Sequence, residues 1–405
     1  MKPAERARLV AAQVLDRVLR GGAYSNVIIR TATEHLEPRD RRFVQRLVFG
    51  AVRRLLRIDR ALAAVATRPL ERIDPLVLSS LRIGAEELLF LGAPPYAAVD
   101  GAVAAVRVGV GEHPTAFVNG VLRALAIAGE PEPGGEIAAL TAGVPGWMYH
   151  RVADQLGPDE ADAFFSASNA EPPVGLRLRT PLALGEPVAG IDGAVTLPAM
   201  EGAADHIASG TVVVADPAST AVGLAVAAEP GMAVADLAAA PGGKTWHVWD
   251  QLEGEGLLIA ADRHPRRLAS ARRRLPAGIQ WLVADAAAPP LRSAAFDRVL
   301  LDAPCTGLGT LRRRPEIRHR IRPASPAELG ARQRRMLEAA LALVKKGGRL
   351  VYSVCTLFRE ETVDVVSGLK AAAPAGLPGE TIDGGLLLAP HLTGTDGMFI
   401  SVLHP

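Results

Sequence analysis

Apolar residues in the first third of the chain recur every three or four positions. In the stretch 41–65 they line one side of a helical projection, and arginines fill the other side. This spacing is typical of an amphipathic α-helix that buries one face. The same period occurs at 7–19, 74–91 and 118–127. We therefore predict an all-helical bundle over residues 1–128.

A change of pattern follows this bundle. Residues 129–146 are rich in proline and glycine, which predicts a linker. Helical spacing returns at 147–169, and a short alternation of apolar and polar residues at 174–180 predicts a strand. Residues 147–211 are thus expected to form a small α+β subdomain.

From residue 212 onward, short apolar runs alternate with helical stretches. The runs predicted as strands are 232–237, 256–262, 279–285, 296–302, 348–354 and 397–403. Two of the intervening segments, 266–275 and 328–344, have the period of helices. This alternation predicts a parallel sheet with helices on both faces, and hence a Rossmann-like α/β domain over 212–405.

Acidic residues and both cysteines of the chain come at the ends of predicted strands. They are Asp236, Asp262, Asp285, Asp302, Cys305 and Cys355. Parallel α/β sheets bind their ligands beyond the carboxyl ends of the strands. We therefore expect the active site at this edge of the sheet.

Composition limits the class of protein. With 49% hydrophobic and 22% charged residues, the chain is globular rather than disordered. Two cysteines exclude a disulfide framework, and the histidines show no zinc-ligand spacing, so no metal is expected. The N-terminus lacks the apolar core of a signal peptide, and no uncharged apolar run approaches ~18 residues. We expect a cytoplasmic protein without a membrane segment.

The distribution of charge is more informative than the net charge of +2. Residues 1–60 carry 14 Lys and Arg against 6 Asp and Glu, and residues 312–335 carry nine Arg against two Glu. Clustered arginine is typical of a phosphate-binding surface. A solvated helical face is the simpler explanation for any single cluster.

A strand, a glycine-rich turn and a helix are predicted at 235–248, with the sequence ADLAAAPGGKTWHV. The glycines allow a close approach of the backbone to a ligand, but their spacing is neither GxGxxG nor Walker A. Asp262 can accept hydrogen bonds from ribose hydroxyls, and Asp285 can meet an adenine amine.

Each of these aspartates alone is explained by a helix N-cap, but together with the turn they indicate an adenosine ligand. Because the phosphate-binding glycines are missing, S-adenosylmethionine fits better than a dinucleotide. The predicted cofactor-binding residues are Ala238, Ala239, Ala240, Pro241, Gly242, Gly243, Lys244, Asp262, Asp285 and Asp302.

Several motifs resemble those of the RNA 5-methylcytosine methyltransferase family. They are DLAAAPGGKT, DAPCTGLGTLRRRPEIRHR, YSVCTLFREET and DGMFISVL. GAYSNVIIR, RDRRFVQRLVFGAVRR, LRIGAEELLFL and FVNGVLRAL resemble the NusB-like domain of its bacterial 16S rRNA branch, the RsmB, Sun or Fmu type. The resemblance covers essentially the whole chain. It implies a multidomain fold with an all-α NusB-like bundle, an α+β RNA-binding subdomain of the N1 type and a class I methyltransferase domain that uses S-adenosylmethionine.

The resemblance also implies roles for the two thiols. Carbon 5 of cytosine is a poor nucleophile, and a thiolate that adds to carbon 6 turns the ring into an enamine that can take up a methyl group. The resemblance assigns this addition to Cys355 and product release to Cys305. Asp302 is expected to hold the cytosine edge, and Lys244 to neutralise the donor's carboxylate or contact the base.

Chemistry alone does not choose between the two thiols, because DNA cytosine methyltransferases use a Pro-Cys nucleophile. Their Glu-Asn-Val motif does not occur in this sequence. Burial in a core is the usual fate of a free cysteine, and the motif context argues against it here. The chain departs from the family pattern at Ala238, Val354 and Thr362, which replace Cys, Thr and Asn, and it keeps the pair Glu360-Glu361. No reacting group is lost.

Arginines around the Pro-Cys motif and on the strand of the subdomain are expected to contact RNA phosphates. The predicted RNA-binding residues are Arg312, Arg313, Arg314, Arg318, Arg177 and Arg179. The arginine-rich helix at 266–275 adds to this surface. The target base must be unpaired or flipped, because a thiol cannot reach a paired carbon.

The expected substrate is 16S rRNA, free or in an early small-subunit particle, and the expected enzyme is a monomer. A tRNA methyltransferase with the same chemistry stays open, and the NusB-like domain argues against it. A non-catalytic RNA-binding assembly factor is the third hypothesis. Both thiols and the donor-binding turn argue against that one.

Overall fold

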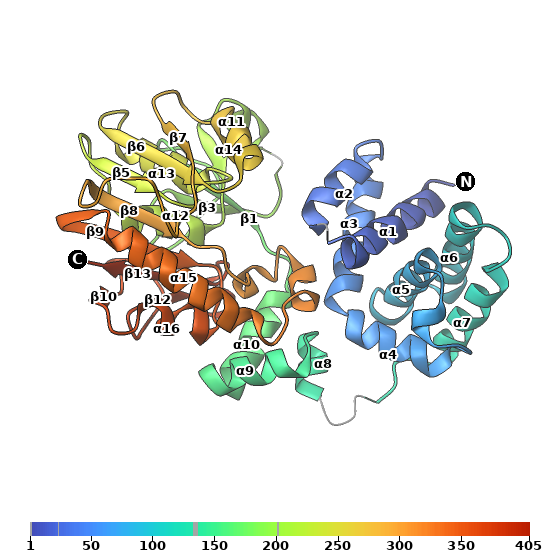
Figure 1. The fold of residues 1–405 in the computed structure, drawn as a ribbon. Helices are drawn as coiled ribbons and strands as arrows, with labels where there is room; N and C mark the ends of the chain where they lie inside the picture. Colours follow the sequence, from blue (N-terminus) through green and yellow to red (C-terminus); the bar gives the residue numbers. More distant parts are fainter. Residues whose placement is uncertain (1, 23, 133–136, 201) are drawn as a thin grey trace. The chain divides into compact units, whose positions relative to one another are not determined.

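The computed structural model describes residues 2–22, 24–132, 137–200 and 202–405. Contacts between residues divide the chain into two compact units, whose elements are labelled in Figure 1. Unit 1 consists of Met1–Asn169 and Arg313–Ile321, and unit 2 of Ala170–Arg312 and Arg322–Pro405. A short segment from within the predicted catalytic domain therefore belongs to the N-terminal unit.

Unit 1 is helical, in agreement with the periodicity of residues 1–128. Its helices are α1 (Pro3–Arg20), α2 (Ser25–Thr33), α3 (Pro38–Arg53), α4 (Leu55–Val65), α5 (Pro75–Phe90), α6 (Pro95–Gly109), α7 (Thr115–Ala128), α8 (Ile137–Ala142), α9 (Gly146–Leu156) and α10 (Pro158–Asn169), with 3-10 helices at Leu70–Arg72 and Pro315–His319. Helix α1 packs against α3, α5 and α6.

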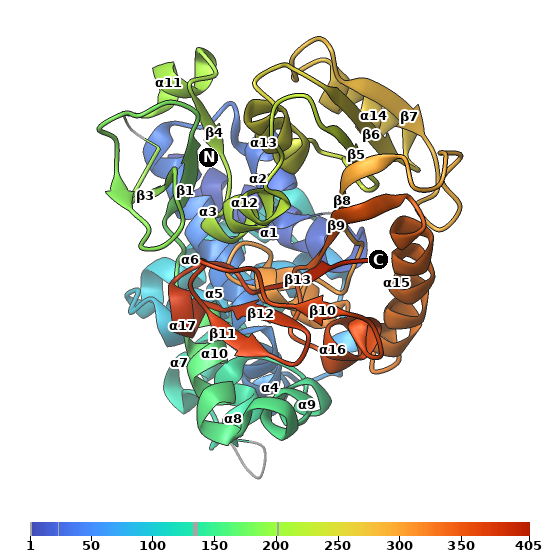
Figure 2. The ribbon, with the colours of Figure 1, turned by 90° about the vertical axis from the view of Figure 1, so that its left-hand side faces the viewer.

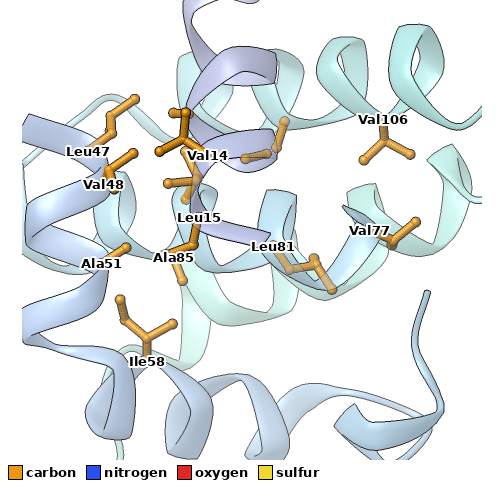
Figure 3. Close-up of a cluster of buried hydrophobic side chains, with 14 of the residues drawn as sticks. Val14, Leu15, Leu47, Val48, Ala51, Ile58, Val77, Leu81, Ala85 and Val106 are labelled. Carbon is orange, nitrogen blue, oxygen red and sulfur yellow. The ribbon is translucent and has the colours of Figure 1, made fainter. Parts of the chain in front are cut away.

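The apolar faces of these helices meet in one core. Figure 3 shows Leu15 of α1, Val48 of α3 and Leu81 of α5 directed into it, and all three side chains are fully buried. Burial of such a side chain contributes roughly 1.5–3 kcal/mol, which explains why one apolar stripe per helix suffices to hold the bundle.

Two local features of unit 1 differ from the sequence pattern. The stretch 41–65, predicted as one helix, is divided between α3 and α4 at Arg54, whose φ is -106°. Helix α8 lies within the predicted linker 129–146, of which residues 133–136 are outside the described residues. Helices α9 and α10 group with unit 1, while the strand predicted at 174–180 groups with unit 2.

Unit 2 contains a small antiparallel sheet and a larger mixed sheet. The small sheet has the order β2-β3-β1-β4, from β1 (Val174–Leu178), β2 (Glu186–Pro187), β3 (Ala194–Leu197) and β4 (Val212–Val214). A short helix, α11 (Ala204–Ala208), precedes β4.

The larger sheet has the order β11-β12-β13-β9-β8-β5-β6-β7, and β10 pairs with β13. Its strands are β5 (Ala233–Asp236), β6 (Leu257–Asp262), β7 (Gln280–Val283), β8 (Phe296–Asp302), β9 (Val344–Val354), β10 (Ala371–Ala372), β11 (Glu380–Ile382), β12 (Gly385–Leu388) and β13 (Met398–Leu403). The predicted parallel pairing holds from β5 to β9. Strand β13 is antiparallel to β9, because it returns from the β11–β12 hairpin rather than from a crossover helix.

Helices cover both faces of the larger sheet, as the sequence predicted. One core joins α12 (Pro217–Val226) and α13 (Gly243–Gln251) to inward-facing residues such as Leu300. The other joins α15 (Ser325–Leu341) and α16 (Val363–Val366) to Val299 and Leu301, the neighbours of Leu300 on β8. Figure 2 shows α12 and α15 on opposite sides of these strands. Helix α14 (Pro265–Arg272) packs against β6 and β7.

The strand order reverses between β5 and β8. Strands β6 and β7 follow β5 on one side, whereas β8 and β9 lie on the other. In doubly wound sheets the ligand site forms at this switch point, beyond the carboxyl ends of the strands. The turn after β5 and the loops after β8 and β9 are therefore expected to carry the residues of a ligand site.

Candidate active site

An ion pair bridges the switch point of the sheet. Lys244, at the start of α13, donates to Asp302 Oδ2 at 2.8 Å, and Ser353 on β9 donates to Asp302 Oδ1 at 2.8 Å. Burial alone would lower the pKa of Lys244, but the charge of Asp302 and its hydrogen bond outweigh this effect and raise it. Lys244 is therefore a fixed positive charge at this end of the sheet.

The two cysteines lie side by side in the adjoining loops. Cys305 follows β8, Cys355 follows β9 directly, and their sulfur atoms are 3.2 Å apart. Both are free thiols and both are half-buried. The hydrogen bond with Cys355, and then burial, raises the pKa of Cys305 well above its usual value, so Cys305 holds its proton at neutral pH. Cys355 is near enough to Lys244 for electrostatic attraction.

Buried aspartates shape the turn between β5 and α13. Asp236 accepts from Thr245 Oγ1 at 2.6 Å, and burial raises the pKa of Asp236 to about 7. Asp262, at the end of β6, accepts from the backbone N–H of Ala240 at 3.1 Å and of His264 at 2.8 Å. These bonds fix the turn relative to the ends of two strands.

The glycines of this turn leave the backbone open. Gly242 has φ 107°, a conformation that favours glycine. A Cβ atom at Gly243 would meet no other atom within 4 Å, so there is space in front of the first turn of α13. The peptide bond between Ala240 and Pro241 is cis. The turn thus leaves space beside Gly243 through which a ligand can approach the backbone.

Two exposed arginines of the helix expected to add to an RNA surface also support this turn. Arg267 of α14 donates to the carbonyl oxygen of Ala240 at 2.8 Å, and Arg274 donates to that of Pro241 at 2.9 Å. The arginine-rich helix 266–275 therefore has a structural role that its composition did not indicate.

Asp285 lies apart from the residues at the switch point. Strand β7 ends at Val283, and the exposed Asp285 accepts from the backbone N–H of Ala287 at 3.0 Å. Arg332 Nη2 lies 3.8 Å from Asp285 Oδ2, as an ion pair. The structure places it in the third loop of the same sheet edge.

Arg318 is not available to RNA in this structure, contrary to the sequence expectation. Its side chain is fully buried in unit 1, where Nη1 donates to Asn169 Oδ1 at 2.8 Å and to the carbonyl oxygens of Arg53 and Ala142 at 3.3 Å. Burial lowers the pKa of Arg318 to about 9. Its guanidinium group therefore binds residues at the C-terminal ends of helices rather than phosphate.

Arg312 and Arg177 are also buried, at 6% and 4% exposure, so the same correction applies to them. Arg312 donates to the carbonyl oxygen of Gly394 at 2.9 Å, and Arg177 pairs with Asp250 at 2.8 Å. Arg179 shares that carboxylate but keeps 30% of its side chain exposed.

Arg313 and Arg314 are the more accessible members of the predicted RNA-contacting set in unit 1. Arg313 is half-buried and Arg314 is exposed. The guanidinium carbon of Arg314 lies 5.2 Å from the ring centroid of Tyr24.

Comparison with known proteins identifies the family. Residues 224–404 match the family described as 16S rRNA methyltransferase RsmB/F, and residues 5–126 match the NusB family. The ribosomal RNA small subunit methyltransferase B of Sodalis glossinidius is 30% identical, over 98% of this chain and 98% of its own. The chain belongs to the RsmB/F family of 16S rRNA methyltransferases. The resemblance inferred from the motifs is thereby confirmed.

Further relatives agree with the RsmB/F assignment. A Mycobacterium tuberculosis (strain ATCC 25618 / H37Rv) protein named as a methyltransferase is 34% identical over 99% of this chain and 97% of its own. The crystal structure of PH0851 has a TM-score of 0.85 over 100% of this chain and 99% of that chain, at 24% identity. NSun6 from Pyrococcus horikoshii with SFG has a TM-score of 0.53, covering 64% of this chain and 98% of that chain, at 20% identity. At these identities the two structures support the fold alone.

Within the described ranges of this RsmB/F chain, no helix is long and apolar enough to cross a membrane. In the same residues, no three or more His, Cys, Asp or Glu side chains gather in a way that could hold a metal ion.

Sequence reasoning missed several polar residues behind the two cysteines. Glu361, Gln333 and Tyr352 are buried and hydrogen-bonded to one another, and Glu361 also binds Thr306. Tyr352, Glu361 and Thr306 lie within the two cysteine motifs, but the motifs did not indicate that these side chains would bind one another. Gln333 lies in a helix whose amphipathic pattern does not mark it as special.

Proposed function

We propose that this RsmB/F protein transfers a methyl group from S-adenosylmethionine to carbon 5 of a cytosine in 16S rRNA. The single observation that supports this most directly is the 3.2 Å between Cys305 Sγ and Cys355 Sγ. The Lys244–Asp302 ion pair lies next to them at the switch point. Two free thiols on adjacent loops fit a reaction that must first form and later break a carbon–sulfur bond.

Residues around the turn fit a nucleoside methyl donor. The proposed contacts are the turn from Ala238 through Ala239, Ala240, Pro241, Gly242 and Gly243 to Lys244, together with Asp262, Asp285 and Asp302. The open space at Gly243 and the carboxylate at the end of β6 support this assignment. NSun6, a fold neighbour, was solved with SFG, an analogue of S-adenosylmethionine. When bound, the donor supplies an electrophilic methyl group.

In the proposed reaction Cys355 adds to carbon 6 of the cytosine as a thiolate. Asp302, held by Lys244 and Ser353, binds the cytosine edge, and its carboxylate stabilises the positive charge that arises when ring nitrogen 3 is protonated. Carbon 5 then takes the methyl group and gives up its proton to water. The electrons of that C–H bond form the ring double bond as the carbon–sulfur bond breaks, which restores the thiolate of Cys355. Cys305, a protonated thiol 3.2 Å from that sulfur, is positioned to assist release.

The names of the relatives favour rRNA over tRNA as substrate. Relatives named ribosomal RNA small subunit methyltransferase B span almost the whole chain, including the NusB part. Of the arginines proposed to contact phosphate, Arg313, Arg314 and Arg179 keep the accessibility that this needs. We assign the NusB-like unit to rRNA or early-particle contacts.

The proposal predicts different defects for the two cysteine variants. Cys355→Ala removes the nucleophile, so methylation of small-subunit rRNA is expected to fall by at least ~10⁴-fold. Cys305→Ala should instead accumulate a covalent enzyme–RNA adduct, visible as a slowly migrating band on a denaturing gel.

Bisulfite sequencing of rRNA and tRNA from a deletion strain identifies the substrate. Loss of a 5-methylcytosine signal in 16S rRNA is the expected result. A loss confined to tRNA would assign the enzyme to tRNA. Full methylation by Cys355→Ala would remove the catalytic proposal, and an adduct formed by Cys355→Ala would exchange the roles of the two thiols.

A further inference from the structure

A buried carboxylate lies behind the two cysteine loops. Glu361 ends the 3-10 helix Arg359–Glu361, six positions after Cys355, and its side chain is fully buried. Its hydrogen-bond partners include Thr306, the residue that immediately follows Cys305.

The carboxylate of Glu361 binds the residue that follows Cys305. The backbone N–H of Thr306 donates to Oε1 at 2.9 Å, and the hydroxyl of Thr306 donates to Oε2 at 2.5 Å. Two hydrogen bonds to one residue fix both its position and its orientation. Both carboxyl oxygens are thus engaged by one residue; burial raises the pKa of Glu361, and these hydrogen bonds oppose the rise.

Gln333 of α15 holds the other side of Cys305. Its Nε2 atom donates to the carbonyl oxygen of Pro304 at 2.9 Å and to Glu361 Oε1 at 3.0 Å. Residues on both sides of Cys305 are therefore attached to the same pair of buried side chains. The hydroxyl of Tyr352 donates to the carbonyl oxygen of Glu361 at 2.7 Å and lies 3.1 Å from Gln333 Oε1, so the pair is itself fixed to β9.

The second cysteine loop joins the same network. Thr356 follows Cys355 as Thr306 follows Cys305, and the two hydroxyl oxygens are 2.9 Å apart. The backbones also approach closely behind them, because a Cβ atom at Gly330 of α15 would lie 2.0 Å from the carbonyl oxygen of Glu360. Behind the two cysteine loops, β9, α15 and the 3-10 helix Arg359–Glu361 are thus joined by hydrogen bonds.

We propose that Glu361 is a positioning residue that sets the separation of the two sulfurs. It acts through Thr306 and Gln333 and touches no reacting atom. The catalytic consequence rests on the proposed function, because it assumes that Cys355 forms the adduct and Cys305 assists its release. The geometric part, that Glu361 keeps the sulfurs close, is independent of that assumption.

Glu361→Gln is the most direct test, because it keeps the shape of the side chain and replaces one acceptor oxygen by a donor. The new amide nitrogen either faces the N–H donors of Thr306 and Gln333, or takes the place of Oε2 and replaces the short hydroxyl–carboxylate bond by a weaker amide–hydroxyl bond. In both orientations the attachment of the Cys305 loop is weakened. A displacement of about 1 Å can cost ~10²-fold in rate. We expect kcat for methylation to fall ~10- to 100-fold with KM for RNA unchanged, and the covalent adduct to accumulate as in Cys305→Ala. Glu360→Gln, the same change at the neighbouring half-buried residue, should leave both readouts as in the wild type.

A second measurement does not depend on the methylation chemistry. The chain has two cysteines, so mild oxidation of the full-length protein with diamide can form one intramolecular disulfide while diamide takes up the two hydrogens. We expect Glu361→Gln to form this disulfide at least ~10-fold more slowly than Glu360→Gln, because the sulfurs no longer meet. Mass spectrometry after alkylation follows the reaction.

Thr306 provides variants that keep Glu361 intact should Glu361→Gln fold poorly. Thr306→Val should reproduce both defects, and Thr306→Ser, which restores the hydroxyl, should rescue them. Wild-type rates of disulfide formation and of methylation in both Glu361→Gln and Thr306→Val would overturn the inference while leaving the proposed function intact. If Cys305→Ala and Cys355→Ala also methylate normally, the proposed function fails, and the disulfide rates alone decide whether Glu361 positions the sulfurs.

Discussion

Asp302 connects the two sides of the switch point through hydrogen bonds. It ends β8, accepts from Lys244 on the β5 side and accepts from Ser353 on the β9 side. About a third of its side chain, 31%, remains exposed, so a base can still reach the carboxylate. A group that is fixed by two partners and still accessible fits a role in binding the base.

Asp302→Asn is predicted to lower kcat for methylation by ~10²- to 10⁴-fold, because an amide cannot stabilise positive charge on the ring or hold the Lys244 ammonium as firmly. Single-turnover methylation of 16S rRNA fragments measures the effect. Asp297→Asn is the matched control, since Asp297 lies at the opposite end of the same strand and pairs with Lys345 at 2.9 Å. Equal activities of the two variants would show that Asp302 has no part in the chemistry.

Asp236 affects stability rather than chemistry. Its pKa is raised to about 7 by burial, from an ordinary value of 3.8. The folded state therefore holds this proton more tightly than the unfolded chain, and the free energy of unfolding falls as pH rises from about 4 to about 7. The difference corresponds to at most about 4 kcal/mol.

Asp236→Asn is predicted to remove this loss of stability between pH 5 and pH 8, because an amide does not titrate. Urea denaturation of wild type and variant at both pH values measures it. Asp297→Asn is the contrast: burial opposes ionisation of Asp297, but the hydrogen bond from Lys345 prevails and lowers its pKa below the ordinary value of 3.8. Its contribution to stability changes only below about pH 4, so this variant should keep the wild-type profile between pH 5 and pH 8. A wild-type pH profile in Asp236→Asn would contradict the prediction.

At the scale of elements, the segment Arg313–Ile321 is the least expected feature. Its 3-10 helix Pro315–His319 is buried in unit 1, where Glu316 accepts from the backbone N–H and the hydroxyl of Ser25 at 3.0 and 2.7 Å. His319 lies 2.8 Å from the carbonyl oxygen of Val52. Charged residues here replace the capping groups that helix ends otherwise need.

Arg318→Met is predicted to lower the free energy of unfolding of unit 1 by ~3 kcal/mol, because several buried carbonyl oxygens lose their donor. For a unit of this size the melting temperature should fall by roughly 6–12 °C. Differential scanning calorimetry of the full chain measures it. Arg322→Met, an exposed arginine just past the segment that pairs with exposed Glu328, should change it by less than ~1 °C.

The sequence predicted most elements, but not which of their arginines would be buried. Periodicity located the stretches that form α1, α3, α4, α5, α7, α9 and α10, but not α2, α6 or α8. It also located the strands that end in Asp236, Asp262 and Asp302, because burial on one face or both leaves a repeating signal. The approach of Cys305 to Cys355 follows from β8 and β9 being neighbours. The sequence does not indicate whether an arginine donates to buried carbonyl oxygens or binds phosphate, so the burial of Arg312 and Arg318 could not be predicted.

At the scale of the whole molecule, each unit has its own core. The bundle of unit 1 is held by one cluster of apolar faces, and the larger sheet of unit 2 by two clusters, one on each face. The antiparallel strands β11 to β13 could not be anticipated, because an apolar run such as 397–403 does not indicate strand direction. The roles proposed for the site residues stay predictions until the variants are measured.

The return of residues 313–321 to unit 1 has a consequence for synthesis. Domains generally fold as units while the ribosome adds some 5 to 20 residues per second, N-terminal part first. Here the first unit cannot be completed when Asn169 emerges, because its last buried piece is translated only after the first part of unit 2, which ends at Arg312. Until then the nascent helices leave part of their apolar surface uncovered. A chain truncated before Arg313 should therefore bind chaperones and be cleaved by proteases rather than form a stable domain.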